Sequence, residues 1–168
     1  ELGNSGDIVK RKINIKNEEI GYVYLASVSS DDKISNFFMK DISSYVKGGK
    51  RSLFEEIFEA IKNSIPNSNL KIIDKKEDIF YHLSSGFTCI FVDGYSKAIA
   101  IETKANLDRA ISESSSEPVL KGPKDSFNEN FHTNIGLIRK RIKDTNLQFT
   151  EVRVGRRSQT KVAIGYIK

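Results

Sequence analysis

Residues 117–166 read EPVLKGPKDSFNENFHTNIGLIRKRIKDTNLQFTEVRVGRRSQTKVAIGY, and this stretch decides how the rest of the chain is interpreted. Five of its apolar residues recur every three or four positions, a spacing that stacks them on one stripe of an α-helix. They are Phe127, Phe131, Ile135, Ile138 and Ile142. Ser126 and Glu129 have the spacing of a capping box. We therefore predict a helix over about 126–143 with this stripe buried.

Two runs rich in β-branched residues follow this helix, at 148–154 and 160–167. A polar turn that begins at Gly155 and includes Arg156 and Arg157 separates them, so the pattern predicts a β-hairpin. In the second run, Val162, Ile164 and Tyr166 alternate with smaller or polar residues. We expect these three side chains to face a core.

Positive charge is concentrated in the same third of the chain. Residues 117–168 hold 11 of the 27 Lys and Arg residues but 5 of the 22 Asp and Glu residues, so the net charge of +5 arises here. Arg139, Arg141, Arg156 and Arg157 are expected to share an exposed basic face with Lys10–Lys12. Such a face suits nucleic acid, anionic lipid headgroups or an acidic partner protein. Nucleic acid is disfavoured, because no aromatic residues interleave the basic ones.

Several motifs in 117–168 resemble the soluble N-terminal domain of the A subunit of spore germinant receptors, the GerA family. They include the Glu117-Pro118 and Gly122-Pro123 steps, the run Leu137 to Ile142, and the segment GRRSQTKVAIGY that begins at Gly155. The resemblance is close over 117–168 and looser over 1–116, where it depends on the order of elements.

The resemblance implies a non-catalytic domain that supports receptor assembly and signal transmission in spore germination. It also implies contacts with other A subunits and with the B and C subunits, at the spore inner membrane and on its cytoplasmic side. The residues expected to make partner or membrane-surface contacts are Glu117, Pro118, Gly122, Pro123, Arg139, Arg141, Arg156 and Arg157. A weak similarity between the first and last predicted hairpins suggests an internal repeat, and hence that the natural protein continues past Lys168.

The first 116 residues predict an α/β unit. Runs at 8–15 and 20–28 form a hairpin around a four-residue polar turn, and 87–92 and 95–103 form another around Asp93-Gly94, a dipeptide typical of a type I′ turn. Apolar periodicity predicts helices over 31–46 and 52–65, and a further helix capped by Asp74 and ended by Gly86. A short strand is predicted at 70–73. The expected sheet is mixed, largely antiparallel and built from three hairpins, with about four helices packed on it.

Domain boundaries follow from composition. Residues 1–7 are polar and are expected to be a disordered end or a remnant of an expression vector. Residues 8–110 form the α/β unit, and 111–126 are rich in Ser, Pro and Gly, as expected of a linker loop. Residues 127–168 then either pack on the first unit or start a second lobe. No apolar run approaches the roughly 18 residues that a membrane-spanning helix needs.

The sequence contains no recognisable catalytic cluster. The two histidines, His82 and His132, are expected at solvated helix positions and have no Cys or carboxylate at ligand spacing. The single cysteine, Cys89, lies in an apolar run and is expected to be buried. We therefore predict no enzyme, metal or cofactor. A domain that binds a small-molecule nutrient and a basic nucleic-acid module remain the alternative functions.

Overall fold

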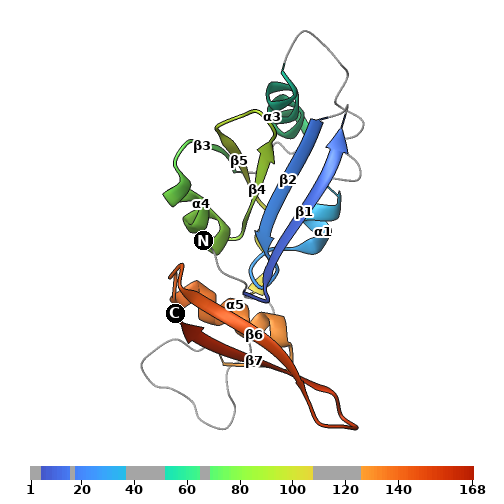
Figure 1. Ribbon diagram of the computed structural model, residues 1–168, viewed down its shortest axis with the longest axis vertical. Coiled ribbons are helices and arrows are strands. Elements are labelled where there is room, and N and C mark those ends of the chain that lie inside the picture. Colours follow the sequence, from blue (N-terminus) through green and yellow to red (C-terminus); the bar gives the residue numbers. More distant parts are fainter. Residues whose placement is uncertain (1–4, 16–17, 37–51, 65–68, 108–125) are drawn as a thin grey trace.

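The computed structural model describes residues 5–15, 18–36, 52–64, 69–107 and 126–168. They form an α/β fold with two antiparallel sheets, of five and two strands (Figure 1). The strands are β1 (Ile8–Ile15), β2 (Glu18–Leu25), β3 (Leu70–Ile73), β4 (Phe87–Val92), β5 (Ala98–Glu102), β6 (Leu147–Val154) and β7 (Thr160–Ile167). The helices with described bounds are α1 (Asp31–Asn36), α3 (Leu53–Ser64), α4 (Lys76–Ser84) and α5 (Phe131–Arg141). The predicted fold class is confirmed.

The larger sheet has the strand order β1-β2-β4-β5-β3, and every neighbouring pair is antiparallel. β2 and β4 lie side by side in its interior, as expected for strands that are apolar on both faces. Both predicted hairpins of this region are present. The turn of the first is shorter than expected, because Ile15 already pairs with Glu18.

Helices cover both faces of the larger sheet. On one face α3 packs Ile57 and Ile61 against β4 and β5 residues such as Ile90 and Ile99. On the other face α4 packs Leu83 against a second cluster. A sheet with two apolar faces is stabilised when helices bury both of them. The predicted helix over 31–46 is described only as α1, since its remaining residues lie outside the described part of the chain.

The Asp93-Gly94 hairpin is confirmed, but its turn type is not. Gly94 has a φ of +80°, while Asp93 is not among the described residues with positive φ. The Tyr95 amide donates to the Val92 carbonyl at 3.1 Å. A single positive φ at the third turn residue defines a type II turn, and the prediction of a type I′ turn is wrong.

One of the three predicted helix caps is confirmed. The capping box of α3 is present, because the Ser52 and Glu55 side chains each accept the other's amide, both at 3.3 Å. The prediction that Asp74 caps α4 is wrong, since the N-cap is Lys75 and makes no side-chain cap. The predicted start of α5 near 126 is also wrong. Its cap is Asn130, whose side chain accepts the Thr133 amide at 3.1 Å.

The third hairpin forms a sheet of its own, β6–β7, and its buried face is opposite to the predicted one. Phe149 on β6 is buried, and its ring lies against Gly165 of β7, where an added Cβ would come within 2.8 Å of it. The small residues Ala163 and Gly165 thus face α5, because they leave room for this ring. Val162, Ile164 and Tyr166 are exposed on the outer face, so the prediction that they face a core is wrong.

Candidate functional site

Helix α5 lies between the two sheets (Figure 1). Ile135 packs with Phe149 in the cluster under the β6–β7 sheet. The five-stranded sheet with its helices is called the larger unit here, and α5 with the β6–β7 sheet the smaller one. Gly136 faces the larger unit, where an added methyl group would overlap the Ser27 carbonyl oxygen. A glycine inside a helix costs roughly 1 kcal/mol relative to alanine. The close approach of the helix to the Ser27 backbone is the physical reason for a glycine here.

Arg139 on α5 carries the main polar contact between the units. Its side chain is 1% exposed and forms a bidentate ion pair with Asp7: Nε donates to Oδ2 at 2.7 Å, and Nη2 donates to Oδ1 at 2.8 Å. Nη1 also donates to the Leu147 carbonyl of β6 at 3.1 Å. The guanidinium lies over the Phe149 ring, 5.1 Å from its centroid. One side chain thus joins the N-terminal segment, α5 and β6.

Residues Ser5 to Asp7 form a bridge between the two units. The Gly6 amide donates to the Phe149 carbonyl at 2.7 Å, and the Asp7 carbonyl accepts the Ala26 amide at 2.9 Å. The Ser5 hydroxyl donates to Asp7 Oδ1 at 2.6 Å and accepts from Arg139 Nη2 at 2.9 Å. The expectation of a disordered end is therefore wrong for residues 5–7, where Ser5 and Asp7 are buried.

Asp7 is held in its ionised form despite its burial. Desolvation by burial, the largest influence, would raise its pKa. The hydrogen bonds and charge of Arg139, together with the hydroxyls of Ser5 and Ser27, outweigh that effect, and the pKa is lowered from the usual 3.8. A buried carboxylate with four hydrogen-bond donors is fully satisfied, as such groups must be to be tolerated.

The predicted contact residues separate into three groups. Glu117, Pro118, Gly122 and Pro123 lie outside the described residues. Arg141, Arg156 and Arg157 are exposed. Arg139 is not on the exposed basic face, because its guanidinium is turned inward to Asp7. The sequence signal that was missed is Gly136, a helix-interior glycine one turn before Arg139.

The β6–β7 hairpin presents an exposed apolar face next to a basic tip. Val152 pairs across the strands with Val162, and Ile164 on the same face is 53% exposed. Arg156 and Arg157 lie in the turn beyond these residues. A groove of about 700 Å³ also opens between α5 and β7, lined mostly by apolar residues such as Phe131, Ile138 and Ala163. This combination fits a protein–protein contact better than a solvated surface.

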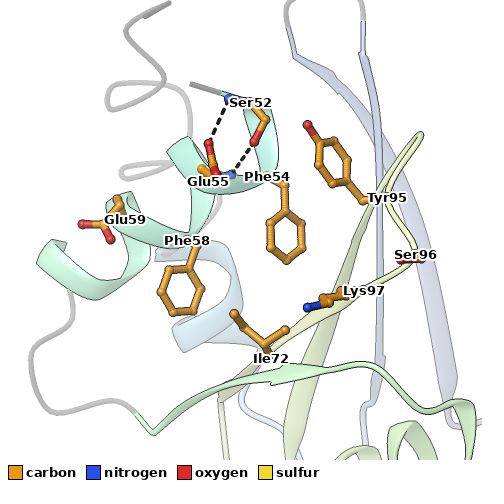
Figure 2. A pocket seen from close by; sticks show the side chains of 9 residues that line it. All are labelled: Ser52, Phe54, Glu55, Phe58, Glu59, Ile72, Tyr95, Ser96 and Lys97. Carbon is orange, nitrogen blue, oxygen red and sulfur yellow. Dashed lines mark hydrogen bonds between the residues drawn. The ribbon is translucent and has the colours of Figure 1, made fainter. Parts of the chain in front are cut away.

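A second groove, of about 530 Å³, lies between α3 and the loop that joins β4 to β5 (Figure 2). Its walls are Phe54 and Phe58 of α3, Ile72 of β3, and Tyr95 and Lys97 of the loop. The Phe54 and Tyr95 rings stack with centroids 5.3 Å apart. No sequence pattern pointed to this groove, because its walls come from three separate elements.

Among the described residues, no group of three or more His, Cys, Asp or Glu side chains could hold a metal ion. Cys89 is buried, as predicted, and desolvation raises its pKa to about 12. His132 is exposed, as predicted, but His82 is buried, so its predicted solvation is wrong. Its Nδ1 lies 2.8 Å from the Asp78 carbonyl and its ring packs edge-on to Phe87. Within the described residues, no helix has the length and apolar character needed to cross a bilayer.

Comparison with known proteins identifies the family of this chain. The family model described as "Bacillus/Clostridium GerA spore germination protein" matches residues 1–168. The chain belongs to the GerA family. Among relatives, "Spore germination protein KA" of Bacillus subtilis (strain 168) is 28% identical over 170 residues, covering 100% of this chain and 31% of that protein. "Spore germination protein B1" of the same organism is 36% identical over 97 residues, covering 58% of this chain and 20% of that protein.

A solved GerA structure has the same fold. The N-terminal domain of the A subunit of the Bacillus megaterium spore germinant receptor GerK3 superposes with a TM-score of 0.70 at 25% identity, covering 99% of this chain and 60% of that chain. The resemblance noted from the sequence is thereby confirmed. This GerA chain spans about a third of the length of full-length relatives such as KA. Neither alternative function, nutrient binding or nucleic-acid binding, gains support from these relatives.

Proposed function

We propose that this chain acts as the N-terminal domain of a germinant receptor A subunit, supporting receptor assembly and signal transmission in nutrient-triggered spore germination. The observation that carries the proposal is the match to the GerK3 A-subunit domain over 99% of this chain. The role is non-catalytic: the domain acts through contacts with other A subunits and with B and C subunits. In the full-length protein it would lie at the spore inner membrane, on the cytoplasmic side.

The contact between the units suits such a role, because transmission needs a body that moves as one. The Arg139–Asp7 pair is buried and bidentate, and such a pair is costly to break. Lys143, just after α5, adds a cation–π contact with the Tyr81 ring of α4 at 5.3 Å. If a partner moved the β6–β7 hairpin, the five-stranded sheet would therefore move with it, because the contact between the two units would stay intact.

The contact surface in this proposal is the β6–β7 hairpin, with its tip residues Arg156 and Arg157 and its apolar outer face. Arg141 extends the basic surface near the end of α5. Glu117, Pro118, Gly122 and Pro123, which lie outside the described residues, remain proposed contact residues. Arg139 acts internally and is left out of the surface, since its side chain is buried. An acidic surface on a neighbouring subunit would complement this region.

The test replaces Arg156 and Arg157 together by Glu in the full-length A subunit and measures germination of spores in response to nutrients. We expect normal protein level and slower or absent germination, because a reversed charge opposes an acidic partner. The matched control is the double change Lys75→Glu and Lys76→Glu, two adjacent exposed lysines at the start of α4, which should leave germination unchanged. Wild-type germination in the Arg156 and Arg157 variant would remove the hairpin tip from the mechanism.

Anionic lipid headgroups are the second candidate partner of the same surface, favoured by the pairing of Arg with exposed Val, Ile and Tyr side chains. Co-sedimentation of the 168-residue chain with phosphatidylglycerol vesicles measures this directly. Binding that is lost in the Arg156 and Arg157 variant would assign the hairpin to the membrane surface. Absence of binding leaves the subunit contact as the proposal.

A further inference from the structure

The second groove, which lies between α3 and the β4–β5 loop and includes Ile72 of β3 in its walls, has the features of a site for an extended peptide. Phe54, Phe58 and Ile72 face a common space, and the Lys97 side chain points into it from the opposite side (Figure 2). Ile72 is 48% exposed and Tyr95 42% exposed, although both lie beside a packed core. The Glu55 carboxylate is engaged with the Ser52 amide, and the Glu59 side chain points away. The groove is therefore apolar and aromatic, and Lys97 is the one cation among its described lining residues.

The strand beside this groove lies at a sheet edge. β3 pairs with β5, and no described residue pairs with its other side. In an antiparallel strand the backbone N–H and C=O groups of alternate residues point away from the partner strand. Some backbone groups of β3 therefore face outward, toward an incoming strand. Edge strands next to an apolar groove are used for peptide recognition by strand addition, with alternate side chains entering the groove.

We propose that an extended segment of a partner protein adds to β3 as a sixth strand of the larger sheet. In this arrangement an aliphatic side chain of the segment packs against Phe54, Phe58 and Ile72. A carboxylate two residues away, and thus on the same face and about 7 Å along the strand, meets Lys97. Charge complementarity favours an acidic segment, because Lys97 faces the groove whereas the Glu59 side chain points away from it. The site is separate from the β6–β7 hairpin and does not depend on the function proposed for it.

The experiment titrates the isotope-labelled 168-residue chain with the capped peptide acetyl-Ser-Leu-Thr-Glu-Thr-amide and follows backbone amide signals. We expect shifts in β3 and in the 93–97 loop. A peptide with Lys in place of Glu should bind more weakly by at least about threefold, the scale of a partly exposed ion pair. A peptide with Ser in place of Leu should also bind more weakly. A peptide N-methylated at both its third and its fourth residue should bind more weakly still, because one of two consecutive N–H groups must face β3 in the ladder.

Protein variants complete the test. Lys97→Glu should reverse the preference between the Glu and Lys peptides, whereas Lys10→Glu, on the exposed strand β1 at the opposite edge of the sheet, should leave the preference unchanged. Equal binding of the N-methylated peptide would overturn strand addition. Shifts of the same size with sodium acetate alone would show only a simple anion site and would also overturn the proposal, as would no response at millimolar peptide. Each of these results is independent of germination in the Arg156 and Arg157 variant.

Discussion

Replacing Asp7 by Asn is the most direct test of how the two units are held together. Asn has the shape of Asp but no charge, and its NH₂ group would face donors where the carboxylate now accepts four hydrogen bonds, two of them from Arg139 and the others from Ser5 and Ser27. Arg139 would keep its charge while remaining buried. The substitution therefore creates an uncompensated buried cation with almost no change in side-chain volume.

The expected cost is about 3–5 kcal/mol in the free energy of unfolding, the usual penalty for removing one partner of a buried ion pair. A loss of about 3 kcal/mol lowers the ratio of folded to unfolded molecules by roughly 150-fold. Urea denaturation followed by circular dichroism measures the loss in the free energy of unfolding. Hydrogen exchange shows where the structure is weakened: the Gly6 and Phe149 amides, which form hydrogen bonds between the N-terminal segment and β6, should lose protection first.

The matched control is Asp74→Asn, at an exposed aspartate that makes no helix cap. It should change stability by less than about 0.5 kcal/mol, as is usual for surface substitutions. The double variant Asp7→Asn with Arg139→Met, which removes the stranded charge, should regain part of the lost stability. A cost below about 1 kcal/mol for Asp7→Asn alone would refute the claim that this pair holds the units together.

Three further predictions concern single features. Gly136→Ala should destabilise the chain by about 1–3 kcal/mol, despite the better helix propensity of Ala, because the methyl group would overlap the Ser27 carbonyl; thermal melting checks this, and a stabilised variant would contradict the close approach. Ser52→Ala should cost about 1 kcal/mol by removing the capping box of α3, whereas Ser158→Ala in the exposed β6–β7 turn should cost little, and urea denaturation compares the two. The stability that comes from ionised Asp7 should be fully present above its unfolded pKa near 3.8 and should be lost as pH falls through the lower folded value, so acid unfolding of Asp7→Asn should lack this step.

Local patterns in the sequence predicted the elements well. The alternation and turn residues identified the three hairpins, the apolar runs placed β2 and β4 in the sheet interior, and Ser52 with Glu55 identified the start of α3. These features depend on residues that are close in the chain, so the spacing of residue types is enough to predict them. The family resemblance rested on the same kind of local motif, chiefly over residues 117–168.

Features that depend on contacts between distant segments were missed or reversed. Asp7 and Arg139 are separated by 132 positions, and nothing in the local sequence of either indicates an ion pair. Spacing alone therefore groups Arg139 with Arg141, its neighbour two residues on, on a solvated basic face. In the β6–β7 hairpin, alternation correctly showed two different faces. It could not show that the face with Gly165 is the buried one, because that depends on where the Phe149 ring lies.

The sequence by itself determined the class of fold, the positions of most strands and helices, and membership of the GerA family, because these follow from periodicity, turn chemistry and short motifs. Only the tertiary structure decided which charges are buried, which face of the last hairpin is exposed, and that residues 5–7 bridge the two units. The physical reason is that burial and ion pairing are properties of side chains brought together by folding, and their energies are set by neighbours that lie far away in the chain.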